Sequence, residues 1–402
     1  MFRYFLALVI LFSCAKRAKN INKIDFLCED CEVKHEITKL PETKPLEPEK
    51  ETRRKPLIFE YDYLKEELNV RTYEEMFEKA MQFYSSGEIE TSAKIFKVLV
   101  ENAPNQRYKD ISMFNLAMSI ERLGEENDAL KLYEELARSD DPEIKEDSIL
   151  RAARIMIAQG KETNINIQDF SDEKRKRFGQ SILLLERTEK ILSELLNGVK
   201  SFGIMSGENS HNQVDTQKLR EINGIIRRLR SEIDGMMINP NEENETKTII
   251  YLCRGNIYFI EAVLIPNTDK EKVKEKVKKL INAQREYFSA VKERQPWWMT
   301  AGVFKIGETY RYLFEDITSS PIPRELKNEQ EKQIYMAELL KEIKRALDLA
   351  KDIYEKNINF SQRAKMKTVW ITRSEEGVEK IKHYMELVQK FIEEIEKEEI
   401  QQ

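Results

Sequence analysis

The sequence predicts an all-α protein. Gly (13) and Pro (11) are scarce among the 402 residues, of which 41% are hydrophobic and 35% charged. This composition is typical of long helices with charged surfaces. Apolar residues recur at helical spacing along most of the chain, and strand-like alternation is not sustained anywhere. Helices are therefore the expected secondary structure.

The first expected element is a signal peptide at residues 1–13. The apolar run from Tyr4 to Phe12 follows Arg3 and has less than half of the ~20 residues that a membrane-spanning helix needs. A basic start, a short apolar core and a small residue before the cut are typical of secretory signals. The motif LFSC at positions 11–14 resembles the lipobox of bacterial lipoproteins, which implies lipidation of Cys14. An ordinary signal or a short anchor is the alternative.

The same resemblance implies a location. Ala15, rather than aspartate, follows the cysteine, which in lipoproteins of this type implies export to the outer membrane, facing the periplasm. Several acyl chains on one cysteine would anchor the protein stably, because each buried methylene contributes ~0.8 kcal/mol.

Residues 14–70 are predicted to form a disordered tether. Four prolines between positions 41 and 56 lie among charged residues, and such a segment buries too little apolar surface to offset its ordering entropy. Cys28 and Cys31 form a CxxC pair here, either a disulfide or an incidental pair, with a redox function as the third alternative. The apolar segment Leu57 to Tyr61 is a candidate for packing back on the helices.

Residues 71–160 contain a repeat. Gly87, Gly124 and Gly160 are 37 and 36 residues apart, and each follows an apolar-periodic helix that a left-handed glycine can end. A small residue that would let two helices approach closely stands seven positions before each glycine: Ala80, Ala117 and Ala153. A period in this range indicates a solenoid of stacked helix pairs.

These segments resemble the tetratricopeptide repeat (TPR) family. The large apolar position of the first helix holds Phe83, Ile120 and Met156. In the second helix Ser92 and Ala129 take the small position, with an aromatic residue four positions later. The third repeat lacks a clear second helix. The resemblance implies a TPR-like superhelix of antiparallel helix pairs that binds other proteins.

Residues 161–400 are predicted to extend this fold with further helices, including TPR-like pairs. Apolar stripes and proline-marked breaks place helices at 178–199, 219–237, 245–264, 269–294, 298–317, 325–356 and 377–399. The segment from Pro296 to Leu326 resembles a distant repeat unit. We interpret Trp297, Trp298 and Trp370 as packing anchors between helices.

On the TPR template ten residues face a concave protein-binding groove: Phe77, Met81, Tyr84, Phe114, Met118, Glu121, Arg122, Leu150, Arg154 and Ile157. Methionine and aromatic side chains suit an apolar or amphipathic segment of a partner. The alternative is that the same face is ordinary core, covered by Leu57 to Tyr61 or by the C-terminal helices.

Other function classes have little support. The net charge of −5 is spread along the chain without a basic stripe, which argues against nucleic acid. Three histidines and four cysteines lack the spacing of a metal or Cys/His site, and no nucleotide-binding or catalytic motif is present. We therefore predict no enzyme, cofactor, metal or small-molecule substrate. The expected function is a lipid-anchored scaffold or adaptor for secretion, outer-membrane biogenesis or motility machinery. The alternative is a structural envelope protein that binds cell-wall polymer or polysaccharide.

Overall fold

The computed structural model describes residues 57–62, 67–198, 216–236, 243–320, 322–323, 326 and 328–400. The predicted signal peptide, Cys14, the CxxC pair and the tether up to residue 56 lie outside these residues. The described part contains twelve α-helices, one short 3-10 helix and two strands, so the all-α fold class is confirmed. The chain divides into two compact units, with a boundary between Gly179 and Gln180, and the predicted end of the repeats at residue 160 lies inside the first of them.

The N-terminal unit comprises the described residues up to Gly179 together with Gln362–Val369. It begins with an antiparallel hairpin of β1 (Leu57–Asp62) and β2 (Glu67–Thr72), where the sequence predicts the end of the tether. The register places Phe59 opposite Val70 and Tyr61 opposite Leu68.

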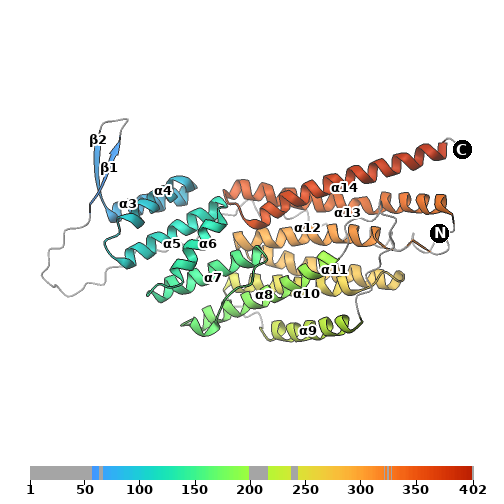
Figure 1. The fold of residues 1–402 in the computed structure, drawn as a ribbon, viewed down its shortest axis with the longest axis horizontal. Helices are drawn as coiled ribbons and strands as arrows, with labels where there is room; N and C mark the ends of the chain where they lie inside the picture. Colours follow the sequence, from blue (N-terminus) through green and yellow to red (C-terminus); the bar gives the residue numbers. More distant parts are fainter. Residues whose placement is uncertain are drawn as a thin grey trace. The chain divides into compact units, whose positions relative to one another are not determined.

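Five helices follow the hairpin and pack in chain order, each against the next (Figure 1). They are α3 (Tyr73–Ser86), α4 (Ile89–Glu101), α5 (Gln106–Leu123), α6 (Glu126–Leu136) and α7 (Pro142–Ala158). After them come a 3-10 turn, η2 (Ile167–Asp169), and the first residues of α8 (Glu173–Gly198). Gly87 and Gly124 end α3 and α5 in the left-handed conformation, with φ of 81° and 86°, as predicted.

Small and aromatic side chains set how closely these helices pack. Ala80 and Ser92 are fully buried, and the Ser92 hydroxyl donates a 2.9 Å hydrogen bond to the Ala80 carbonyl oxygen across the α3–α4 pair. The Phe77 and Phe96 rings meet edge to face, 5.5 Å apart. A serine in place of alanine at the small position therefore costs little stability, because its buried hydroxyl is hydrogen-bonded.

The C-terminal unit contains the rest of α8 and six further helices. These are α9 (Thr216–Gly235), α10 (Asn244–Leu264), α11 (Lys270–Lys292), α12 (Pro296–Thr318), α13 (Glu329–Ala364) and α14 (Val369–Ile400). Most lie within a few residues of their predicted positions. The exception is the predicted break at 357–376, which narrows to residues 365–368 because both flanking helices are longer than predicted.

The last two helices run side by side in Figure 1. Contacts at both ends support this: Lys341 is 2.7 Å from Glu396, and Asn357 donates to Ser374 at 3.0 Å. The three tryptophans are buried, and the Trp297 ring lies edge-on to Trp298 and Trp370. They therefore anchor packing within this unit, as predicted.

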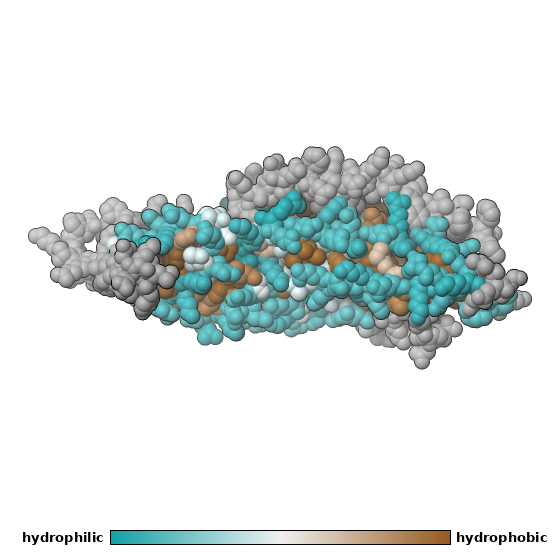
Figure 2. All heavy atoms as spheres, turned by 90° about the horizontal axis from the view of Figure 1, so that it is seen from above, coloured by the Kyte–Doolittle hydropathy of each residue, from teal (hydrophilic) through white to brown (hydrophobic). Residues whose placement is uncertain are grey.

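Hydrophilic residues cover much of the face seen in Figure 2, with apolar residues showing between them. Ile225 of α9, at 36%, is the one large hydrophobic side chain classed as exposed among the described residues. Of the helices that the structure describes, none combines the length and the apolar composition that crossing a bilayer would require.

Candidate functional site

The ten residues predicted to face a groove all lie in the N-terminal unit, on α3, α5 and α7. Eight are buried: Phe77, Tyr84, Phe114, Met118, Glu121, Arg122, Leu150 and Ile157. Met81 and Arg154 are partly buried. Little of the surface of these side chains is therefore exposed to solvent, and their role in binding a partner stays a prediction. The side chains of the first proposed cover, Leu57 to Tyr61, are outside those described.

Glu121 of α5 holds three helices together. Its Oε1 accepts a 2.9 Å hydrogen bond from Nε of Arg154 on α7, and its Oε2 accepts one of 2.9 Å from the Tyr133 hydroxyl on α6. Arg151 Nη1 lies 3.6 Å from the same Oε2, and its guanidinium stands over the Phe114 ring. A carboxylate only 4% exposed is thereby paired and hydrogen-bonded, as a buried charge must be.

Arg122, the next residue, points to a different partner. Its guanidinium stacks 5.1 Å from the Tyr84 ring, and Nη1 donates to the Tyr84 carbonyl oxygen at 3.2 Å. Nε donates to the carbonyl oxygen of Lys365 at 3.2 Å, and Nη2 donates to that of Ala364 at 3.3 Å. Burial lowers the pKa of Arg122, but the planar fork of donors still matches two successive carbonyl groups.

Residues Gln362–Val369, which we call the docked turn, complete the site. The Lys367 backbone N–H donates to the Arg122 carbonyl oxygen at 3.1 Å. The Val369 backbone N–H donates to Oε1 of Glu126, the first residue of α6, at 2.6 Å. With the two bonds from Arg122, the turn makes four backbone hydrogen bonds to α5 and α6.

Two glycines of the repeat accept side chains of the docked turn. A Cβ atom at Gly87 would lie 2.8 Å from Cδ of Lys365, and one at Gly124 would lie 2.9 Å from Cβ and Cδ of Lys367. Cβ atoms essentially never approach other heavy atoms so closely. These glycines therefore serve both the left-handed helix ends and the close approach of the turn.

Glu126 is the residue of this site whose charge state changes near neutral pH. Burial raises its pKa to about 7, and nearby Glu121 adds to that effect. The Val369 N–H, the Arg154 charge and a hydrogen bond from Gln159 act in the opposite direction. Glu126 is 6% exposed, so its carboxyl group faces the protein rather than water.

The hydrogen bonds of this site include four to the backbone of the docked turn. Its polar groups pair with one another or with the docked turn, and the site residues named above include no serine, threonine or cysteine nucleophile beside a base. Cys253 is in the C-terminal unit, where burial raises its pKa and keeps the thiol protonated. Within the described residues there is no cluster of His, Cys, Asp and Glu able to hold a metal ion.

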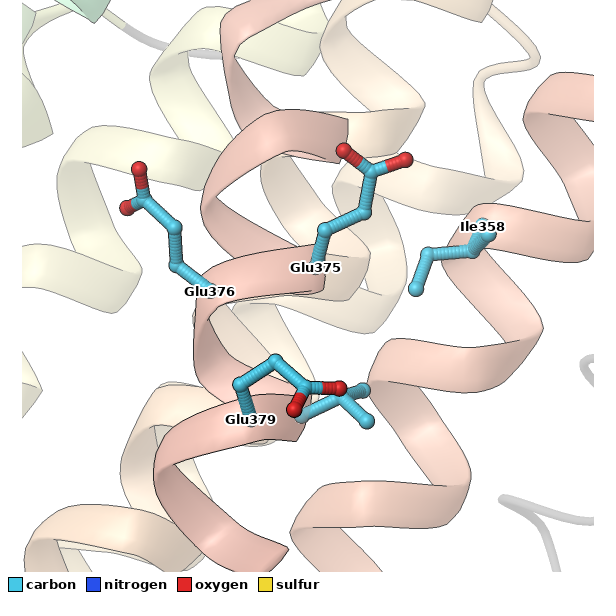
Figure 3. A pocket seen from close by; sticks show the side chains of 5 residues that line it. Ile358, Glu375, Glu376 and Glu379 are labelled. Carbon is cyan, nitrogen blue, oxygen red and sulfur yellow. The ribbon is translucent and has the colours of Figure 1, made fainter.

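A second surface feature lies between α13 and α14 (Figure 3). It is a shallow depression of about 560 Å³ lined by Ile358, Val378 and three glutamates. In Figure 3 the carboxylates of Glu375 and Glu379 lie toward the helix of Ile358, and that of Glu376 points away. Glu379 already accepts a hydrogen bond from Lys382 at 2.6 Å. The five lining residues offer three carboxylates and no hydrogen-bond donor from a side chain, so this feature resembles a solvated helix surface.

The sequence predictions found Arg122 but missed its partners. Glu126 and the docked turn were not among the predicted site residues, because the turn is 243 positions from Arg122 and is held by its backbone. Backbone contacts leave no residue pattern to read. The one available sign was the predicted helix break between 356 and 377, within which the turn lies.

Comparisons with family models, with curated proteins and with solved structures give no match. The contacts of Arg122, Glu126 and the docked turn are therefore the basis for proposing a function.

Proposed function

We propose that this protein is a lipid-anchored scaffold or adaptor that faces the periplasm and binds other proteins in an outer-membrane or envelope assembly. The observation that supports this is the manner in which the N-terminal unit holds the docked turn. A turn between two helices is bound through its backbone by Arg122 and Glu126, on a surface built from successive helix pairs. That is the task a peptide-binding helical repeat performs.

The repeat pattern supports the same proposal. We propose that α3 to α7 are two TPR-like units and the first helix of a third, continued by further helices. The alanines and glycines of the motif lie at buried contacts and at helix ends, and the helices pack in chain order. Stacked helix pairs present a long surface for other proteins, and little in the site favours catalysis.

The anchor is tested on the full-length chain expressed in a bacterium with a lipoprotein pathway. We expect the mature protein to begin at Cys14, to carry acyl mass on that residue and to fractionate with the outer membrane. Cys14→Ser should remove the acyl mass and release the protein from the membrane. A mature chain that begins elsewhere and carries no acyl group would refute the anchor without affecting the scaffold.

The scaffold is tested by cross-linking in intact cells of the source organism, followed by purification of the tagged full chain and quantitative mass spectrometry. We expect the same few envelope proteins to co-purify in replicate experiments. A matched sample of the Cys14→Ser chain, with the signal peptide removed, controls for location. If no protein is enriched and the purified chain instead pellets with isolated peptidoglycan, the cell-wall alternative replaces the scaffold.

A further inference from the structure

We infer that the docked turn is a self-ligand: it occupies a peptide-binding edge of the N-terminal unit, and a turn-forming segment of a partner protein binds there when the docked turn is released. The edge consists of Gly87 and Gly124 with Arg122 and Glu126. This inference rests on the proposed protein-binding function and deepens it by naming the surface and the kind of partner.

The first argument is the type of contact. Arg122 donates to the carbonyl oxygens of Ala364 and Lys365, and the N–H groups of Lys367 and Val369 donate to the protein. All four bonds use the backbone of the turn. A segment with another sequence can make the same four bonds, provided that it forms the same turn between helical residues and has no proline at the two donor positions.

The second argument is the spacing of the turn along the repeats. Lys365 packs at Gly87 and Lys367 at Gly124, so alternate residues of the turn contact equivalent glycines of successive helix pairs. Lys365 is itself left-handed, so the segment is a tight turn rather than an extended strand. Both lysine side chains are long and unbranched, and they pack where the glycines have no side chain.

The third argument concerns where the turn stops. Gly160 is the next glycine of the series and also adopts the left-handed conformation, with φ of 73°. A Cβ atom there would meet nothing within 4 Å, and Gly160 is exposed. The turn does not continue toward it, because α14 begins at Val369. A partner segment that continues past the turn has this additional position available.

The fourth argument is that the turn is held under a constraint that a partner would not share. Lys365 has φ of 46°, a conformation that residues other than glycine disfavour. Lys365 and Lys367 are also exposed beyond their contacts with the glycines. The turn competes well mainly because it is part of the same chain, which gives it a high effective concentration.

The test removes one backbone bond without changing the edge. Val369→Pro deletes the N–H that Glu126 accepts, and proline is well suited to Val369 because that residue is the first of α14. Val369→Ala keeps the N–H and is the matched control. The probe is a synthetic peptide of residues 362–369, acetylated, amidated and labelled with a fluorophore, and its binding to the full chain is followed by anisotropy.

We expect the peptide to bind the Val369→Pro chain at least about tenfold more tightly than the wild-type or Val369→Ala chain, since one lost hydrogen bond of ~1.4 kcal/mol changes the docking equilibrium about tenfold. In hydrogen exchange, the amides of the docked turn should exchange faster in the proline variant while those of α5 stay protected. Retained protection of α5 shows that the unit is folded.

Equal peptide affinity for all three chains, or no binding to any of them, would overturn the inference. So would exchange of the turn only together with α5, because the turn would then be a fixed part of the fold. Glu126→Ala, which removes the acceptor instead of the donor, provides a second opening variant with Glu126→Gln as its control. If the peptide results hold and no envelope protein cross-links, the proposed function fails while the peptide-binding edge stands. If cross-linking succeeds and the turn does not open, only the self-ligand inference fails.

Discussion

The packing of Tyr354 predicts that adding one methyl group to α12 will destabilise the C-terminal unit. The Tyr354 ring on α13 lies between two helix glycines. A Cβ atom at Gly307 of α12 would lie 2.4 Å from Cε1 of the ring, and one at Gly377 of α14 would lie 2.6 Å from Cε2. Tyr354 is fully buried and its hydroxyl donates to Glu308, so the ring has little freedom to move aside.

Two opposing effects decide whether Gly307→Ala raises or lowers the free energy of unfolding. Alanine is the better helix former, and replacing glycine within a helix stabilises by about 0.5–1 kcal/mol when the site has room. Forcing an extra methyl into a filled core costs about 1–3 kcal/mol. With both edges of the Tyr354 ring against helix backbone, we expect the packing cost to exceed the gain in helix propensity and the free energy of unfolding to fall by about 1–2 kcal/mol.

Urea unfolding followed by tryptophan fluorescence measures this change, because all three tryptophans are in the C-terminal unit. The matched control is Gly224→Ala in α9, where a Cβ atom would meet nothing within 4 Å. The control should raise the urea midpoint, by an amount that corresponds to about 0.5–1 kcal/mol. A rise in the midpoint of Gly307→Ala as well would show that the helices do not pack as closely as described.

Three further predictions concern buried charges. Glu121→Gln removes the carboxylate that pairs with the Arg154 guanidinium, so we expect the N-terminal unit to lose about 3–5 kcal/mol of stability. Chemical denaturation followed by circular dichroism measures this loss. The control is Asp128→Asn, which breaks an exposed pair and should cost less than about 1 kcal/mol. Burial raises the pKa of Glu126 to about 7, so the folded state keeps a proton that the unfolded state releases near pH 4.5. The stability of the N-terminal unit should therefore fall by up to about 3 kcal/mol as the pH rises from 4.5 through 7. Glu126→Gln should make this stability independent of pH between 4.5 and 7, and a wild-type stability that rises there would contradict the raised pKa. Burial opposes ionisation of Glu308, but the charge of the adjacent Arg311 outweighs burial and lowers the pKa of Glu308 to about 2. Its ionised form should therefore contribute about 3 kcal/mol to folding stability above pH 4.5, and this contribution should vanish as the pH falls through 2. Glu308→Gln should lack this sensitivity to acid.

Most of the helical architecture could be predicted because its signals are local. Gly87 and Gly124 end helices for a reason that the single residue carries, and the prolines that mark the breaks act on their immediate neighbours. Gly377 shows the limit of such signals. It was expected to start a helix, yet it lies within α14, where the Tyr354 ring needs the space that a Cβ atom would fill. A helix glycine that serves packing cannot be told from one that serves as a helix end without knowing what lies opposite.

The sequence predicted Arg122 at the candidate site but not the segment that Arg122 binds. The repeat template places its side chain on the correct face, because the position within the helix determines which way it points. Its partner depends on which remote segment reaches that face, and the docked turn does so through backbone atoms that every sequence possesses. The three equivalent glycines of the repeat make the same point. Gly87 and Gly124 have turn side chains against them, whereas Gly160 has open space, although the sequence pattern around them predicts one role for all three. The structure therefore separates helix termination, which all three share, from peptide contact, which two of them have, and it is the second property that makes this edge a candidate binding surface.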